Sequence, residues 1–117
     1  DARHLQNSQW ITLGSHAYSH TPLTRLMGND LLDELDRAST VFDKEIGERM
    51  RVFAYPNGDH DELTAAAVRS AGHELAFTTE SGLVAPGDDR FRLKRVNISE
   101  AGTTSDARFL CRLFGWF

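Results

Sequence analysis

Apolar residues recur with a helical period in the first half of the chain. The set begins near Asp30 and returns at spacings of four, three, four and four residues: Leu31, Leu35, Ala38, Phe42 and Ile46. Side chains at these spacings lie on one face of a helix, so the pattern predicts an amphipathic helix packed on a core. Gly47, a typical residue after a helix end, predicts where this helix stops.

Two further helices are expected from the residues that begin and end them. The first has Asp59 or Asp61 as its N-terminal cap, an alanine-rich body and Gly72 at its C-terminal end. The second begins after Ser105 and ends at Gly115. Its apolar residues are spaced to form a buried face: Phe109, Leu110, Leu113 and Phe114.

Short apolar runs bounded by turn residues predict the strands. Three of them fall at residues 10–13, 52–55 and 75–79. A fourth run, residues 91–98, changes the phase of its alternation between Leu93 and Val96, which predicts a bulged or broken strand. Strands that alternate with helices in this order indicate an α/β fold with a mainly parallel sheet.

The composition restricts the function classes. The 117 residues carry 13 lysines and arginines against 17 aspartates and glutamates, a net charge of −4, with 40% hydrophobic and 26% charged residues. We expect a single soluble globular domain over residues 1–117. The longest purely apolar run, residues 65–68, is far shorter than the roughly 20 residues of a membrane span, and the scattered cations argue against nucleic-acid binding. The lone Cys111 excludes an internal disulfide and is expected to be a small buried hydrophobe.

Two histidines four residues apart, His16 and His20, follow the first predicted strand. In an extended chain they would lie about 13 Å apart, too far to share a metal ion, whereas a curled loop brings them to roughly 6 Å. A metal site therefore requires this loop to curl, and the Thr21–Pro22 pair after it predicts a helical turn. Ala17 stands where the zinc-protease helix signature has its glutamate, so protease activity has no support. The alternative is that both histidines are ordinary polar or capping residues.

A second candidate is the turn of residues 53–59, which places Pro56 and Asn57 at the C-terminal end of a predicted strand. Ligand sites of open α/β sheets and of barrels lie at such strand ends. Backbone N–H groups fixed by a rigid turn can donate hydrogen bonds to a developing oxyanion. The alternative is a simple connection between a strand and a helix.

Taken together and in this order, three segments resemble the polysaccharide deacetylases, the NodB-homology group of carbohydrate esterases (family 4). These are Ile-Thr-Leu-Gly-Ser-His-Ala-Tyr-Ser-His over residues 11–20, Phe-Ala-Tyr-Pro-Asn-Gly-Asp over 53–59 and Ala-Gly-His-Glu-Leu-Ala-Phe-Thr-Thr over 71–79. The histidine loop is the most specific of them, and the resemblance extends from about Trp10 to the last helix. It implies a partial, distorted β/α barrel.

The resemblance also implies a divalent metal, most commonly zinc, held by His16, His20 and an aspartate. In the family this aspartate belongs to a Thr-Phe-Asp-Asp motif on an earlier strand, whose second carboxylate is the general base. That motif is absent here, and the chain begins at Asp1 without methionine, so we expect an N-terminally truncated domain. Asp59 and Asp61 are the nearest substitutes within the chain.

The family's Arg-x-Pro-Tyr-Gly motif falls on residues 54–58, with Ala54 in place of arginine and Asn57 in place of tyrosine. The resemblance therefore assigns the catalytic oxyanion donor to the Asn57 N–H, and substrate binding to Tyr55, Pro56 and Gly58. The histidine of the family's Leu-x-His motif, its general acid, has no counterpart after His73, and its Asp-x-x-Asp-Trp motif is also absent. No general acid is assigned.

Two functions follow from this reading. The first is a metal-dependent hydrolase that removes N-acetyl groups from a polysaccharide or other glycan. The second is a catalytically impaired glycan-binding or interaction module of the same fold. A glycan is the expected partner, and homo-oligomers are expected because a partial barrel exposes sheet edge and apolar helix faces. Family habit places such proteins at the cell envelope or outside the cell, although no signal peptide is visible.

Overall fold

The computed structural model describes residues 2–99 and 105–114, in which helices and strands alternate. The helices and strands are α1 (Ala2–Gln6), α2 (Asn29–Ile46), β1 (Val52–Ala54), α3 (Glu62–Ser70), β2 (Leu75–Ser81), β3 (Leu93–Arg95) and α4 (Asp106–Leu113). Two short 3-10 turns, η1 (Leu23–Arg25) and η2 (Pro56–Gly58), complete the set. The turn predicted after Thr21 and Pro22 is η1.

The three strands form a parallel sheet in the order β1-β2-β3. Phe53 of β1 pairs with Ala76 of β2, and Phe77 of β2 pairs with Leu93 of β3. The register between β2 and β3 shifts between Phe77 and Ser81, and β3 ends at Arg95. The predicted parallel sheet is confirmed, as is the irregularity that the broken alternation after Leu93 indicated.

The predicted strand at residues 10–13 is wrong. The chain pairs with β1 only at Ser15, whose N–H donates to the Val52 carbonyl at 2.8 Å and whose carbonyl accepts from Ala54 N–H at 2.8 Å. Gly14 permits this approach, since a Cβ there would come within 2.9 Å of the Val52 oxygen. Trp10 is 85% exposed, so the apolar residues before Gly14 lack the packing that would hold them as a strand.

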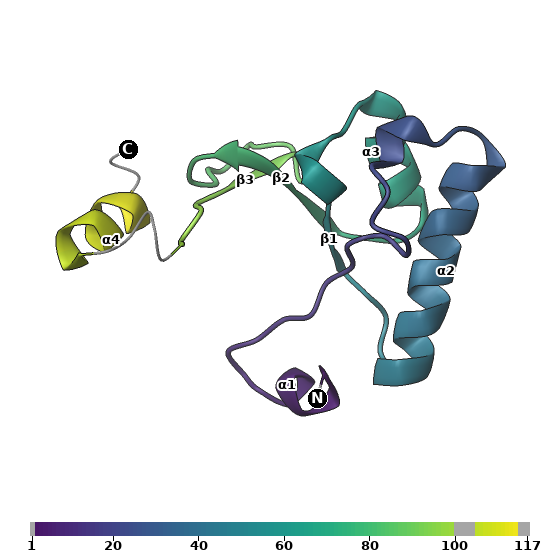
Figure 1. Cartoon of the computed structure of the whole chain (residues 1–117), viewed down its shortest axis with the longest axis horizontal. Helices are drawn as coiled ribbons and strands as arrows, with labels where there is room; N and C mark the ends of the chain where they lie inside the picture. Colours follow the sequence, from purple (N-terminus) through teal and green to yellow (C-terminus); the bar gives the residue numbers. More distant parts are fainter. Residues whose placement is uncertain (1, 100–104, 115–117) are drawn as a thin grey trace.

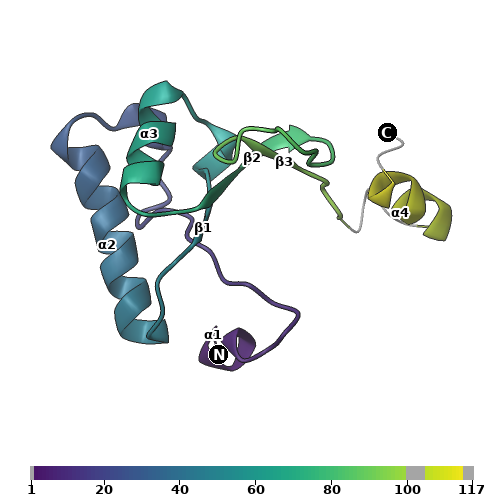
Figure 2. The same cartoon turned by 180° about the vertical axis from the view of Figure 1, so that it is seen from behind.

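The helices α2 and α3 lie side by side on one side of the sheet (Figures 1 and 2). Helix α2 agrees with the prediction and ends at Gly47, whose φ of 82° is the left-handed conformation that glycine adopts readily. Helix α3 settles the choice of cap in favour of Asp61: its carboxylate accepts from Thr64 N–H, and the Thr64 hydroxyl accepts from Asp61 N–H.

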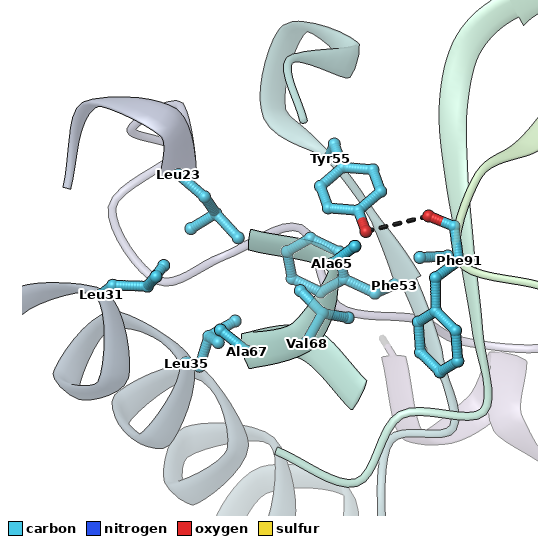
Figure 3. Packing of buried hydrophobic residues seen from close by; sticks show 10 residues of the cluster. Leu23, Leu31, Leu35, Phe53, Tyr55, Ala65, Ala67, Val68 and Phe91 are labelled. Carbon is cyan, nitrogen blue, oxygen red and sulfur yellow. Dashed lines mark hydrogen bonds between the residues drawn. The ribbon is translucent and has the colours of Figure 1, made fainter. Parts of the chain in front are cut away.

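The core lies between the sheet and these two helices (Figure 3). It is built from residues of η1, α2, β1, α3, β2 and the segment before β3: Leu23, Leu31, Leu35, Phe53, Tyr55, Ala65, Ala67, Val68, Ala76 and Phe91. Tyr55 is buried with its hydroxyl donating to the Phe91 carbonyl at 3.0 Å, so its polar atom is paired inside the core. This bond links the end of β1 to the chain entering β3.

Helix α4 forms as predicted, with the Ser105 hydroxyl accepting from Arg108 N–H, but its expected buried face is exposed. Helical spacing records which face is apolar, not whether another surface covers it, and α4 stands apart from the sheet and the other helices in both views (Figures 1 and 2). Cys111, on the same helix, is exposed rather than buried. Gly115, the predicted end, lies outside the described residues. Among the helices that the structure describes, none has the length and apolar character to cross a bilayer.

Candidate functional site

The loop that carries His16 and His20 is curled, as shared metal binding requires. Ala17 and His20 both have a φ of 64°, a left-handed conformation that costs about 1–2 kcal/mol for a residue with a Cβ. The two imidazole ring centroids consequently lie only 4.7 Å apart, with their planes at 69°. The sequence predicted that these rings approach one another only in such a conformation.

The end of β1 fixes the orientation of His16. Its Nδ1 lies 2.7 Å from the Ala54 carbonyl oxygen, which can only accept a hydrogen bond. Nδ1 therefore carries the proton in this contact, and in the neutral ring Nε2 keeps a free lone pair. A backbone carbonyl that holds one ring nitrogen while the other is left for a cation is a common arrangement of metal-binding histidines.

Three further contacts hold the loop between the two histidines. Ala17 packs against the core, while Ser19 donates two hydrogen bonds to Oε1 of Glu34, from its N–H at 2.5 Å and from its hydroxyl at 2.9 Å. Glu34 is buried on α2. The sequence analysis missed this residue, although one signal was present: Glu34 lies three residues after Leu31 and four before Ala38, on the apolar face of the helix.

The second candidate segment, η2, follows β1 and presents Asn57 at its tip. Asn57 has a φ of 58°, and the N–H groups of Gly58 and Asp59 donate to the carbonyls of Tyr55 and Pro56. Asn57 N–H has no hydrogen-bond partner among the described residues, while its carbonyl accepts from the Thr79 hydroxyl at 3.3 Å. The turn is thus held on both sides while one exposed donor stays unpaired.

The turn residues assigned to substrate binding lie mainly beneath its surface. Tyr55, Pro56 and Gly58 are buried. Burial, with a smaller effect of the nearby Asp89, raises the pKa of Tyr55 to about 12. His60 stacks on Tyr55 at a centroid distance of 5.3 Å, with its Nδ1 2.8 Å from the Gly58 carbonyl oxygen. Substrate contact therefore stays a prediction for these residues, and it concerns the backbone and shape of the turn rather than the Tyr55 ring.

No carboxylate in residues 2–99 or 105–114 completes a three-residue metal group with the histidine pair. The suggestion that Asp59 or Asp61 substitutes for the family aspartate is therefore wrong for the described part of the chain. Asp61 is committed to the cap of α3, and the hydrogen bonds from the Thr64 backbone and side chain lower its pKa. The structure supplies two nitrogen donors of a metal site and not the third ligand.

The positive φ angles connect these two segments. In the described residues other than glycine, φ is positive at three positions, Ala17, His20 and Asn57, and all three lie in the histidine loop or in η2. Such backbone conformations are costly and occur often at functional sites. The profile of the polysaccharide deacetylase family matches residues 1–76, more than half of the chain. The chain belongs to the polysaccharide deacetylase family.

Solved structures of deacetylases have the same fold. The Streptococcus pyogenes deacetylase PplD, in complex with acetate, matches with a TM-score of 0.75 and 21% identity over 83% of this chain and 42% of its own. A polysaccharide deacetylase from Bacillus cereus gives 0.75 and 23% over 87% and 32%. IcaB from Ammonifex degensii gives 0.74 and 21% over 98% and 51%.

These likenesses confirm the predicted fold, a partial β/α barrel of the deacetylase type with parallel strands. The chain spans between 32% and 51% of the length of these three proteins. A search of curated proteins found no sequence that matches the chain. Family and fold are therefore established, whereas the ligands and the reaction of this chain are matters for proposal.

Proposed function

We propose that this chain carries part of the active site of a metal-dependent hydrolase that removes N-acetyl groups from a polysaccharide or other glycan. The observation that supports this most strongly is the approach of the His16 and His20 rings to 4.7 Å, with Nε2 of His16 free. A deacetylase-like function also accords with the family to which the chain belongs.

The donor set fits a divalent cation such as zinc. Imidazole nitrogens are common zinc ligands, and a catalytic site combines three protein ligands with an open position. His16 and His20 would be two of these ligands, with the third coming from outside the described residues. A cation held there would supply Lewis-acid activation of both water and the acetyl carbonyl.

The chain's own turn would stabilise the transition state. Hydrolysis adds water to the acetyl carbon, the carbon–nitrogen bond breaks, acetate leaves, and the departing amine takes up a proton. Negative charge develops on the carbonyl oxygen as water adds, and the unpaired Asn57 N–H would donate to that oxygen. The buried Tyr55 and the Thr79 bond to Asn57 would keep this donor in place, while Pro56 and Gly58 shape the surface against the glycan.

A second candidate function is a glycan-binding or interaction module that has lost catalysis. It is favoured by one observation: among the described residues, no third metal-ligating side chain joins the histidine pair. The two functions share the fold and the loop. They differ in whether the chain releases acetate.

Zinc binding tests the metal-dependent proposal. We expect the 117-residue chain to bind zinc in a titration, and the double variant His16→Ala/His20→Ala to lose this binding. His4→Ala, which removes an exposed histidine from α1, is the matched control and should bind zinc as the unmodified chain does. Equal zinc binding by the chain and the double variant would reject the site.

Acetate release from N-acetylglucosamine oligomers separates the two functions. The hydrolase proposal predicts zinc-dependent acetate release that the double histidine variant lacks. Asn57→Gly should retain activity, because glycine keeps the N–H and adopts a positive φ readily. Glycan binding without acetate release by the zinc-loaded chain would favour the binding module instead.

A further inference from the structure

The loop between the two histidines is anchored to α2 by a single buried side chain. Glu34 is 9% exposed, and its Oε1 accepts both hydrogen bonds from Ser19, the residue before His20. The Ser19 hydroxyl also lies 2.8 Å from the Thr21 hydroxyl, which follows His20. Glu34 thus holds the backbone directly before His20, and Ser19 links it to the residue directly after.

The opposite end of the loop is fixed differently. His16 is held by the Ser15 pairing with β1 and by its own Nδ1 contact with Ala54. His20 has a φ of 64°, a conformation that a residue with a Cβ adopts at a cost. Without an anchor beside it, the backbone at His20 would relax toward negative φ and carry its ring away from His16.

A buried carboxylate is costly unless it is well hydrogen-bonded, and its bonds to N–H and O–H donors are strong ones. Among the described residues, the ion pairs that the structure contains do not include Glu34, so its hydrogen-bond donors are those of Ser19. The carboxylate therefore has no other evident role on this face of α2 than to hold the loop. An aliphatic residue would fill the same core position without a polar group to satisfy.

We propose that Glu34 is the positioning residue of the histidine pair: by holding Ser19, it keeps His20 in the left-handed conformation that brings its ring against His16. The use of this placement in metal binding rests on the proposed function. Groups that support metal ligands in this way typically change metal affinity by about 10- to 100-fold when removed.

The test measures ring placement and zinc affinity separately. In the metal-free chain, nuclear Overhauser contacts between the ring protons of His16 and His20 report their approach, and zinc titration reports the affinity. Glu34→Ala should abolish the contacts and weaken zinc binding by about 10- to 100-fold. Glu34→Gln, whose amide oxygen can still accept from Ser19, should keep the contacts and an affinity within about threefold of the unmodified chain. Asp33→Ala, an exposed carboxylate on α2, is the matched control.

Several outcomes would overturn the proposal. One is a Glu34→Ala chain that keeps both the ring contacts and the zinc affinity. Another is a Glu34→Gln chain that loses as much affinity as Glu34→Ala, because the charge and not the placement would then be responsible. If Glu34→Ala does not fold, Ser19→Ala decides, since it removes the hydroxyl bond alone: weakened ring contacts support the proposal, and unchanged contacts reject it.

Failure of the proposed function gives a different result. In that case zinc would bind the double histidine variant as well as the unmodified chain, yet the ring contacts would still depend on Glu34. Loss of ring contacts in Glu34→Ala alone therefore supports the positioning role whatever the metal result.

Discussion

At the scale of single residues, the candidate site depends on backbone conformations that its amino acids do not favour. Ala17, His20 and Asn57 are the residues other than glycine with positive φ in the described chain. The sequence predicted that the histidine loop must curl, because the chemistry required it. It could not predict which residues would take up the curl, since that follows from long-range contacts such as that of Ser19 with Glu34.

Gly58 tests how tightly the η2 turn is fitted to β2. Its φ is 79°, and a Cβ there would come within 2.7 Å of the Thr79 backbone nitrogen. We expect Gly58→Ala to lower the free energy of unfolding by about 2–5 kcal/mol, through left-handed strain and overpacking. Gly87→Ala is the control, because φ is 98° but a Cβ would meet nothing within 4 Å. It should cost only the strain, about 1–2 kcal/mol in urea denaturation. Equal costs would show that the turn has room for a methyl group.

His73 gives the fold a specific pH dependence. Burial lowers its pKa below the ordinary value of 6.5, and nearby Arg49 lowers it further. The unfolded chain therefore binds the proton more readily, so the stabilising contribution is complete above pH 6.5 and is lost as pH falls through the folded-state pKa. Urea denaturation should show lower stability at pH 5.5 than at pH 7.5. His73→Leu should reduce this difference, whereas the exposed His4→Ala should leave it unchanged. An undiminished difference in His73→Leu would assign the effect to other groups.

At the scale of elements, periodicity and capping residues predicted the helices well. The start of α2 near Asp30, its stop at Gly47 and the cap of α3 at Asp61 were all readable because they depend on neighbours in the sequence. The strand at residues 10–13 was wrong because strand pairing depends on a partner elsewhere in the chain. The same limit explains α4, whose apolar face is real but uncovered.

The buried stripe of α2 predicts a sharp contrast between two neighbouring leucines. Leu35 is 1% exposed in the core, and Leu32 is 54% exposed. Leu35→Ala should lower the free energy of unfolding by about 2–5 kcal/mol, because it removes buried methyl groups and leaves a cavity. Leu32→Ala should change it by less than about 0.5 kcal/mol. Chemical denaturation of both variants measures this, and similar losses would mean that α2 packs through a different face.

At the scale of the whole molecule, the described chain leaves apolar surface uncovered. The exposed large apolar residues include four on α4: Phe109, Leu110, Leu113 and Phe114. Contiguous apolar patches promote association with other surfaces. The sequence predicted such association from the expected partial barrel, and the exposure of α4 adds a specific segment to that prediction.

Substitutions on α4 test whether this face drives association. We expect the unmodified chain to sediment faster as its concentration rises, and Phe109→Ser/Leu113→Ser to sediment as a monomer at the same concentrations. Because both side chains are exposed, the double variant should unfold at nearly the same denaturant concentration as the unmodified chain. Concentration-independent sedimentation of the unmodified chain would contradict the prediction.

The family and fold of the molecule were predictable because the motifs of residues 11–20 and 53–59 occur in the right order along the chain. Its third metal ligand was not, because no described residue supplies one. The central claim is therefore the shared use of His16 and His20, which does not depend on the identity of that ligand.

The most direct test is anomalous diffraction at the zinc absorption edge from crystals of the chain grown with zinc. The account predicts an anomalous peak within coordination distance, about 2.1 Å, of one ring nitrogen each of His16 and His20, with Nδ1 of His16 still on the Ala54 carbonyl. No peak between the two rings, or a peak bound by other residues alone, would contradict it.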